Sequence, residues 1–429
     1  MIKMLVFMPN FKKHIGHWTI VFLTIIPVGI WLKLHIGLPS FWSARSLSQI
    51  FGLAGSVLLS LNFVLALRSK KLEPYFGGLN RIYILHHQTG AYAFVLLLFH
   101  PVAMILDYLR LSVVSAAQLI VPSIGNIPVS LGILALWLMI ILLVLTFYVN
   151  LPYQIWKFTH QWLGLTLLLA TLHVYSIPSD VAVYMPLRVY ILVLSALGLA
   201  AYIYRTLLGR WLVKKTSYTV HSVEVLNNQV SKILLEPVKK PISFHAGRFI
   251  FIDVKSLGIS RESHPFSLIS DPDSSQLQIA AKSSGDYTET LKLLKVGSSV
   301  RIEGPFGGFL YQQSRYKSQI WIAGGIGITP FLSMSADLAH HPGYQAALYY
   351  VVSTPDEALF SPRNVQLHVH ISKTQGRLTA ETVAKDYLDF KSRDIFICGP
   401  PPMMTSLRSQ FNKLGVKNSR IHTEEFSLQ

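Results

Sequence analysis

The chain begins with long apolar runs separated by short polar loops and continues with a more polar pattern. An apolar run of about 20 residues is the length that a helix needs to cross about 30 Å of hydrocarbon. Six such runs are expected, at about 18–38, 47–67, 82–106, 129–149, 157–177 and 186–208. From Thr216 onward, short runs alternate apolar and polar residues between glycines and prolines, as strands do. The pattern therefore predicts membrane helices followed by a polar module.

The polar half itself divides into two patterns. Alternating runs such as Tyr218 to Val225 and Arg248 to Val254 favour a small antiparallel β-barrel. Later, apolar strands are interleaved with helical stretches, which is typical of a parallel α/β domain. The expected fold is therefore multidomain: a six-helix all-α transmembrane bundle over 1–215, an antiparallel β-barrel over 216–312 and an α/β parallel-sheet domain over 313–429.

Composition narrows the class of protein. Among the 429 residues, 51% are hydrophobic and 14% are charged, against about 25% charged in ordinary soluble domains. A purely cytosolic enzyme and a disordered chain are thereby excluded. The single cysteine, Cys398, excludes an intramolecular disulfide, a cysteine-rich zinc site and an iron–sulfur cluster held by cysteines of this chain.

The net charge of +17 is concentrated in the apolar half. Residues 1–215 contain 16 basic and 3 acidic side chains, and residues 216–429 contain 22 and 18. Twelve of those 16 basic residues fall in the terminal segments and loops on one side of the expected spans and four on the other, so by the positive-inside rule both termini are expected in the cytoplasm. A surplus of basic residues at the ends of apolar runs indicates the orientation of the chain in the membrane. The positive net charge is therefore not taken as a sign of a nucleic-acid partner, and none is expected.

Histidines occur at two depths in the third and fifth spans. His86 and His100 are 14 residues apart and share a helix face to within about 40°, whereas His87, 13 residues from His100, is turned away. His160 and His173 are also 13 apart, so the fifth span needs a bend or a π-turn to face the third span twice. Because both spans run in the same direction, His86 is expected opposite His160, and His100 opposite His173 about 20 Å away.

Histidine inside a membrane span is costly and is usually functional. The two matched pairs predict two bis-histidine b-type haems, with histidines that merely bond neighbouring carbonyls as the alternative. Glycines four residues after His86 and His160, namely Gly90 and Gly164, are expected to let a flat macrocycle lie against each helix. The unpaired histidines, including His35, are interpreted as polar residues at the membrane boundary.

Two glycine-containing turns follow expected strands in the last third of the chain. The strand at 319–323 runs directly into Gly324-Gly325-Ile326-Gly327-Ile328-Thr329-Pro330, where backbone N–H groups can face a pyrophosphate. The strand at 394–398 ends at Cys398, which begins a second turn, Cys398-Gly399-Pro400-Pro401-Pro402-Met403. Both turns are expected at the carboxyl edge of the sheet, where open α/β folds bind ligands.

In this order, these features resemble the ferric reductase and NADPH oxidase superfamily. Its members join a six-helix haem-b membrane domain to a ferredoxin-NADP reductase-like module. The resemblance covers nearly the whole chain. It implies a transmembrane haem domain over 1–215, an FAD-binding β-barrel over 216–312 and an NAD(P)H-binding α/β domain over 313–429.

The resemblance also implies flavin-binding residues in the barrel. The segment His264-Pro265-Phe266-Ser267 is similar to the family motif H-P-F-[ST], in which the aromatic ring lies against the isoalloxazine and the hydroxyl approaches its N5. Related soluble reductases have an arginine in place of the histidine. Lys282 and the segment Gly285-Asp286-Tyr287-Thr288 resemble the part that cradles the flavin pyrophosphate at a helix N-terminus.

The nicotinamide site is implied in the same way. The family's nucleotide loop, G-G-x-G-x-T-P, is matched at Gly324, Gly325, Gly327, Thr329 and Pro330. Cys398, Gly399 and Pro400 begin a C-G-P-x-x-M segment whose thiol lies near the nicotinamide in the family. Phe426 is similar to the terminal aromatic that covers the flavin, although here three residues follow it.

The resemblance implies one electron path. Hydride passes from NADPH or NADH to FAD, and single electrons then pass through the two haems to a small-molecule acceptor outside, either oxygen or ferric iron. No obligatory protein partner is expected, and the setting is a bacterial inner (plasma) membrane with the FAD/NAD(P)H module in the cytoplasm. The alternatives are the same path delivering to a partner protein, and a haem-binding transport or sensor domain with a regulatory nucleotide module.

Overall fold

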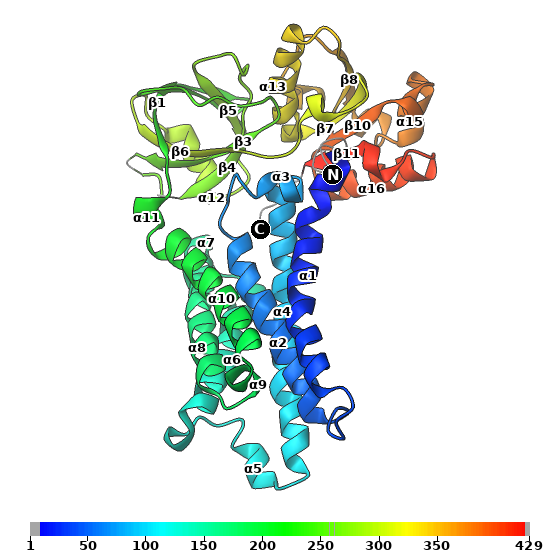
Figure 1. Ribbon diagram of the computed structural model, residues 1–429. Helices are drawn as coiled ribbons and strands as arrows, with labels where there is room; N and C mark the ends of the chain where they lie inside the picture. Colours follow the sequence, from blue (N-terminus) through cyan, green and yellow to red (C-terminus); the bar gives the residue numbers. More distant parts are fainter. Residues whose placement is uncertain (1–8, 257, 261, 425–429) are drawn as a thin grey trace. The chain divides into compact units, whose positions relative to one another are not determined.

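The protein is described here from a computed structural model that covers residues 9–256, 258–260 and 262–424. The chain forms two compact units (Figure 1). The first contains the described residues up to Phe76 together with Arg81–Val213, and the second contains Gly77–Asn80 together with the described residues from Lys214 onward. Phe426 lies outside the described residues.

The first unit is helical. Its elements are α1 (Pro9–His35), α2 (Ala44–Leu65), α3 (Glu73–Phe76), α4 (Leu79–Leu109), α5 (Val113–Ala117), α6 (Ile127–Phe147), α7 (Tyr153–Gln161), α8 (Leu163–Ser176), α9 (Asp180–Val183), α10 (Met185–Tyr202), η3 (Ile203–Leu207) and α11 (Gly209–Leu212). The close approach of α2 and α10 depends on a glycine, because a Cβ at Gly198 would lie 2.8 Å from the Ser60 carbonyl oxygen. Small residues at such contacts are typical of membrane helices.

Among the described residues, five helices are long and apolar enough to cross a membrane: α1, α2, α4, α6 and α10 with its continuation η3. The expected single span over 157–177 is interrupted, because α7 ends at Gln161 and α8 begins at Leu163. The 14 residues of α8 rise about 21 Å at 1.5 Å per residue, less than the hydrocarbon thickness. The interruption falls between His160 and His173. A bend or π-turn was expected between them, because their 13-residue spacing does not put both side chains on one face of a straight helix.

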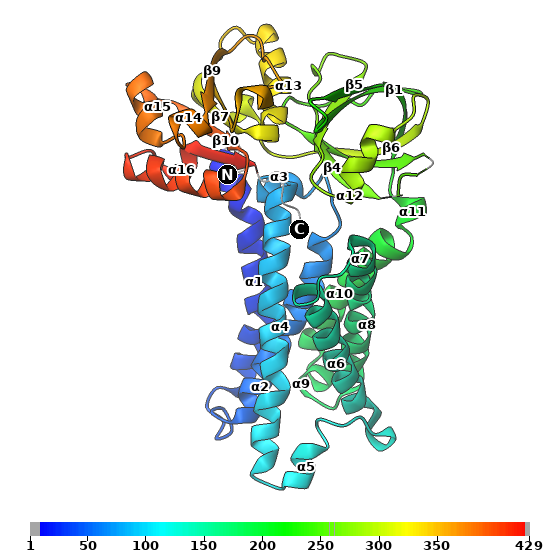
Figure 2. The ribbon, with the colours of Figure 1, turned by 180° about the vertical axis from the view of Figure 1, so that it is seen from behind.

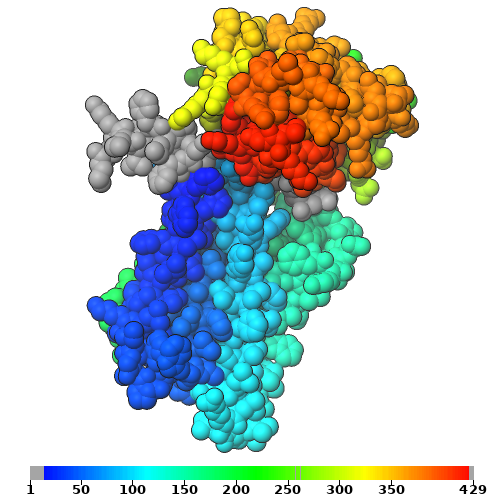
Figure 3. Space-filling model, turned by 90° about the vertical axis from the view of Figure 1, so that its right-hand side faces the viewer, coloured from blue at the N-terminus to red at the C-terminus, as the bar shows by residue number. Residues whose placement is uncertain are grey.

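Exposed apolar side chains cover the outside of the first unit. Figure 3 shows the face on which α1, in blue, and α4, in light blue to cyan, are exposed. Trp18 and Phe22 of α1 are 68% and 65% exposed, and Tyr92 of α4 is 65% exposed. Large aromatic rings facing outward over a long helical surface fit a lipid environment and not water.

The second unit begins with an antiparallel sheet in the order β4-β3-β6-β1-β2-β5. Its strands are β1 (Thr216–Leu226), β2 (Val230–Pro237), β3 (Phe249–Lys255), β4 (Ser263–Ser267), β5 (Leu277–Lys282) and β6 (Ser299–Phe306). The two edges meet after β4, where Leu268 bridges to Ile279 and Ile269 N donates to Gln278 O at 2.8 Å. The short helix α12 (Asp286–Thr290) follows β5.

A parallel sheet in the order β11-β10-β7-β8-β9 completes the second unit (Figure 2). Its strands are β7 (Ser318–Gly324), β8 (Gln345–Val352), β9 (Gln366–Ile371), β10 (Asp394–Cys398) and β11 (Ile421–Glu424), and its longer helices are α13 (Thr329–Asp337), α15 (Ala380–Asp386) and α16 (Pro401–Lys413). The chain proceeds from β7 to β8 and β9 on one side, then returns to β10 on the other. The strand order therefore reverses between β7 and β10, the position where open α/β sheets bind ligands.

Candidate functional site

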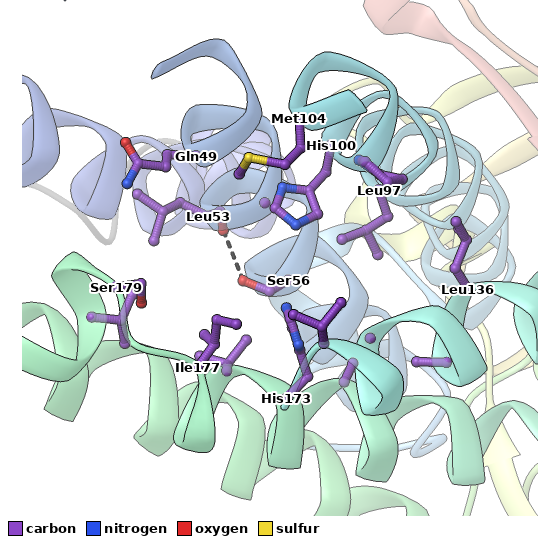
Figure 4. A pocket seen from close by; sticks show the side chains of 18 of the residues that line it. Gln49, Leu53, Ser56, Leu97, His100, Met104, Leu136, His173, Ile177 and Ser179 are labelled. Carbon is purple, nitrogen blue, oxygen red and sulfur yellow. Dashed lines mark hydrogen bonds between the residues drawn. The ribbon is translucent and has the colours of Figure 1, made fainter. Parts of the chain in front are cut away.

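His100 and His173 face one another across a cavity in the first unit (Figure 4). His100 comes from α4 and His173 from α8, and their ring centres are 6.4 Å apart with the ring planes at 66°. The cavity has a volume of about 980 Å³ and is lined mainly by leucine, isoleucine, valine and alanine side chains. A largely apolar cavity of this size with two converging imidazoles can enclose a large, flat cofactor.

A second pair lies nearer the N-terminal ends of the same two segments of chain. His86 of α4 and His160 of α7 have ring centres 6.3 Å apart and ring planes at 69°. The neighbouring His87 is exposed. A metal ion with two imidazole ligands at about 2.0–2.1 Å places the ring centres about 6 Å apart, so both separations fit bis-histidine coordination of one metal each.

The hydrogen bonds of three of these imidazoles fix the ring nitrogen that can bind a metal. Nδ1 of His100 lies 2.8 Å from Ser48 O, Nδ1 of His173 lies 2.7 Å from Pro128 O, and Nδ1 of His86 lies 3.0 Å from Asn62 O. A carbonyl oxygen only accepts, so each Nδ1 carries the proton. Each Nε2 then presents a lone pair, which is the form that ligates a metal.

His160 is held differently. Its Nδ1 is 3.5 Å from Thr146 Oγ1, and its ring stacks on Trp156 with centres 5.4 Å apart and an interplanar angle of 11°. The Thr146 hydroxyl donates to Leu142 O at 2.7 Å, which leaves its oxygen lone pairs toward His160. The orientation of His160 therefore depends more on ring stacking than on a strong hydrogen bond.

The role expected for Gly90 and Gly164 is wrong. A Cβ at Gly90 would contact the Asn62 amide at 3.0 Å, and one at Gly164 would overlap the Tyr202 ring. These glycines make room for side chains of α2 and α10, not for a macrocycle, because Asn62 of α2 and Tyr202 of α10 pack against them.

Two other glycines lie against the histidines. A Cβ at Gly52 of α2 would lie 2.9 Å from His100 Nδ1, and one at Gly132 of α6 would lie 2.8 Å from His173 Nδ1. Sequence reasoning missed them because they are distant in sequence from the histidines that they contact. The available signal was a glycine in the middle of an apolar run. Glycine destabilises a helix at such a position, so its presence there indicates close packing against a neighbour.

The expected flavin residues begin on β4. The His264 ring stacks on Tyr287, with centres 4.0 Å apart and planes at 23°, and His264 Nε2 lies 2.6 Å from Glu262 Oε2. Phe266 and Ser267 are buried, at 8% and 5% exposure. The structure thus brings together two expected residues from separate segments and adds Glu262, which no sequence motif selected.

Tyr287 has a feature that suits a bound ligand. Its hydroxyl is buried and has no hydrogen-bond partner among the described residues. Burial, followed by the carboxylates of Glu262 and Asp253, raises the pKa of Tyr287 well above its ordinary value, so the phenol stays protonated at neutral pH. A buried neutral donor without a partner fits a site where an acceptor oxygen of a ligand would complete the hydrogen bonding.

The other expected pyrophosphate residues lie close by in sequence and structure. Lys282 ends β5 and is exposed, and Gly285 precedes α12, whose first residue is Asp286. Thr288 Oγ1 accepts from the backbone N–H groups of Gly285 and of Ser284, at 3.1 and 2.9 Å. This turn is therefore already fixed by its own hydrogen bonds.

The two glycine-containing turns interlock at the carboxyl edge of the parallel sheet, where the strand order reverses. A Cβ at Gly327 would overlap the Cys398 carbonyl, and one at Gly324 would lie 2.7 and 2.8 Å from Met403 and Pro400. Gly325 has φ +52° and Gly399 contacts Gly324 directly. Thr329 and Pro330 begin α13 and are buried.

Cys398 is fully buried at the end of β10, in register with Glu424 of β11. Burial, and then the charge of Glu424, raises the pKa of the Cys398 thiol well above its ordinary value. The thiol is therefore neutral and acts as a small packing group beside the turns, not as a nucleophile. Phe426, expected near this site, lies outside the described residues.

Two family models match the chain. The model described as "Ferric reductase like transmembrane component" matches residues 51–171, and a model of an FAD-binding domain matches residues 215–315. The first match contains His86, His100 and His160, and His173 lies two residues beyond its end. The second contains the antiparallel sheet with the His264–Tyr287 stack.

Curated relatives match the second half. The carnitine monooxygenase reductase subunit of Escherichia coli is 31% identical over 223 residues, which are 49% of this chain and 68% of that protein. The flavohemoprotein of Bacillus subtilis is 25% identical over 52% of this chain, and only 61% of its own length is covered. A solved FAD/NAD-binding domain of nitric oxide dioxygenase from Vibrio cholerae has a TM-score of 0.44 and 23% identity over 49% of this chain and 98% of that one.

Proposed function

The chain belongs to the ferric reductase and NADPH oxidase superfamily, and we propose that it is a transmembrane oxidoreductase. In this proposal NAD(P)H is oxidised at the second unit. Bound FAD would supply the chemistry that couples a two-electron hydride donor to one-electron carriers. The His86–His160 and His100–His173 pairs would each hold one b-type haem, and the haems would supply one-electron transfer to an acceptor on the other side of the membrane, either oxygen or ferric iron.

The observation that carries the proposal is the geometry of the two histidine pairs. Ring centres at 6.3 and 6.4 Å match the separation of two imidazoles on one iron. Protons fixed on Nδ1 in His86, His100 and His173 leave Nε2 ready to ligate. Each pair would supply two imidazole ligands to one iron, and the haem held there would supply one-electron chemistry.

Different residues of the second unit would hold different parts of the two cofactors. His264, Phe266, Ser267 and Tyr287 would hold the flavin. The Tyr287 hydroxyl, which has no hydrogen-bond partner in the described part of the chain, would donate to it. Pro265 would belong to the flavin motif with Phe266 and Ser267, and Lys282, Gly285, Asp286 and Thr288 would form the adjoining pyrophosphate turn. The loop from Gly324 to Pro330 would hold the nucleotide phosphates, and the neutral Cys398 with Gly399 and Pro400 would shape the nicotinamide position.

The membrane arrangement follows from the helices and the charges. In the proposal α7 and α8 together make a sixth crossing, and residues 1–215, 216–312 and 313–429 are the haem, FAD and NAD(P)H domains. Both termini and the nucleotide module lie in the cytoplasm, because the lysine and arginine residues of the first half concentrate on that side.

The test uses the purified full-length chain with FAD and haem. Under anaerobic conditions NADH or NADPH should reduce first the flavin and then both haems, as followed by stopped-flow absorbance. Oxygen or a ferric chelate should then reoxidise the haems. The proposal is wrong if the protein retains no haem, or if reduced flavin does not pass electrons to haem.

A further inference from the structure

The nucleotide loop and the end of strand β8 lie side by side at the carboxyl edge of the parallel sheet. Gly324, which ends β7, is in register with Val351 of β8. Gly325 of the loop and Glu357, which follows β8, line one small cleft. A dinucleotide whose phosphates bind at a glycine-rich loop places its adenosine ribose near the end of the following strand. The residues after β8 therefore lie where NADH and NADPH differ, at the 2′ position of that ribose.

Two carboxylates follow β8 in the short helix η8 (Pro355–Glu357). Glu357 Oε2 accepts from the backbone N–H of Ser353 at 3.2 Å, which ties η8 to the end of the strand. The carbonyl oxygen of Asp356 accepts from Asn227 Nδ2 at 3.1 Å, and the Asp356 side chain is exposed. The backbone of η8 is thus held on both sides, and the Asp356 carboxylate is left at the surface.

The Asp356 carboxyl is ionised at neutral pH. Hydrogen bonds from the Thr354 hydroxyl and from its own backbone N–H lower the pKa of this carboxyl below its ordinary value, and Asn227 and the charge of Lys373 lower it further. An ionised carboxylate accepts hydrogen bonds from hydroxyl groups and repels other anions. Asp356 can therefore accept from a free ribose hydroxyl, whereas it would repel a phosphate at the same place.

Two basic residues, Lys373 and Arg377, come after the neighbouring strand β9 and are exposed. The Lys373 backbone N–H donates to Ser353 O at 3.3 Å, so the start of α14 (Ser372–Gln375) lies beside the end of β8. The Lys373 charge acts on Asp356, as the lowered pKa of that carboxyl indicates. A phosphate that approached Lys373 here would therefore also meet the carboxylate that opposes it.

We propose that Asp356 is a specificity-determining residue that makes NADH, and not NADPH, the electron donor of this protein. The inference rests on the proposed function and narrows its substrate. The carboxylate would accept a hydrogen bond from the ribose 2′-hydroxyl of NADH, and its charge would repel the 2′-phosphate of NADPH. Because the nicotinamide is the same in both nucleotides, the selection acts on binding and leaves the hydride transfer unchanged.

The first experiment compares the two nucleotides as donors to the full-length protein with FAD. Under anaerobic conditions, stopped-flow flavin reduction at low nucleotide concentration should be at least about 10-fold faster with NADH, because a phosphate carries nearly two negative charges. The rates at saturation should agree. The preference should become smaller as ionic strength rises, since salt screens exposed charges.

The variant Asp356→Asn removes the charge and keeps the size of the side chain. It should remove most of the difference, mainly through tighter NADPH binding, because Lys373 is then no longer opposed. Asp389→Asn is the matched control. Asp389 is also an exposed carboxylate with a basic partner, Arg393 Nε at 2.9 Å, but it precedes β10 and so lies at the amino edge of the sheet. This variant should keep the wild-type preference.

Calorimetric binding of two fragments separates this inference from the proposed function, because it needs neither haem nor electron transfer. The wild-type protein should bind 5′-AMP more tightly than adenosine 2′,5′-bisphosphate, and Asp356→Asn should reduce the difference. Equal or tighter binding of the bisphosphate by the wild-type protein, or an unchanged preference in Asp356→Asn, would overturn the role of Asp356. Failure of both NADH and NADPH to reduce the flavin would instead overturn the proposed function.

Discussion

The two histidine pairs have nearly equal ring separations but different surroundings. His100 and His173 lie in a cavity of about 980 Å³, and both donate to backbone carbonyls at 2.8 and 2.7 Å. In the other pair, His86 donates to a carbonyl at 3.0 Å, whereas Nδ1 of His160 lies 3.5 Å from the Thr146 hydroxyl. The position of each histidine along its helix and the helix face it occupies therefore determine which histidines pair. The hydrogen bonds from neighbouring helices determine how strongly each imidazole is held in place.

This difference has a chemical consequence for a metal bound by either pair. A hydrogen bond from Nδ1 to a carbonyl orients the ring and makes Nε2 a stronger donor to the metal. Both rings of the His100–His173 pair have such a bond, and only one ring of the other pair does. The following substitutions test whether the two sites differ as these contacts indicate.

The largest effect is expected from removing a ligand. His173→Leu should abolish haem binding at the His100–His173 site, so haem content should fall to about half of the wild-type value, because the other pair is intact. A pyridine haemochrome assay measures the loss. Flavin reduction by NAD(P)H should continue at the wild-type rate, and an unchanged haem content would contradict the assignment of this pair.

The next effect is expected from displacing a ring without removing it. In Gly132→Ala the new Cβ would lie 2.8 Å from His173 Nδ1 and would force the imidazole away from the Pro128 carbonyl. Haem affinity at that site should fall by about 10 to 100-fold, as for other losses of a ligand's supporting contact. Gly29→Ala is the control, because nothing lies within 4 Å of a Cβ there.

A smaller effect is expected in the other pair. Thr146→Val removes the weak acceptor of His160 at 3.5 Å. A less basic imidazole stabilises oxidised iron less, so one of the two midpoint potentials should rise, by less than the roughly 59 mV that corresponds to a tenfold change for one electron. A redox titration in the Soret band resolves this shift. A shift in both potentials would show that the two sites are not independent.

The smallest effect is expected at His87. His87→Leu should leave haem content and both potentials unchanged, because His87 is exposed and it is His86 whose ring faces His160. Its partner experiment is His86→Leu, which should lose about half of the haem. Loss of haem in the His87 variant and not in the His86 variant would mean that the helical-phase argument selects the wrong residue.

Hydrophobic length and periodicity predicted most of the fold. The expected spans agree with α1, α2, α4, α6 and α10 to within a few residues, except for the N-terminal end of α1, because a lipid-solvated helix must be apolar over its whole length. The strands β7 and β10 were also expected, since central parallel strands are apolar throughout. The edge strands β9 and β11 were not, because β9 is half-exposed and β11 has four residues, and neither carries that signal.

The residues that have the chemistry could be identified from the amino-acid sequence: the four membrane histidines, the glycine-containing turns and the segment around His264. These are local patterns, and their spacing is sufficient to find them. The contacts that hold these residues in place could be found only in the folded chain. Gly52 and Gly132 against the imidazoles, the carbonyls that fix the ring protons, and the contact of Asp180 with Trp31 across 149 residues all join segments far apart in the chain. Such contacts follow from how helices pack, and a periodicity along one helix contains no information about its neighbour.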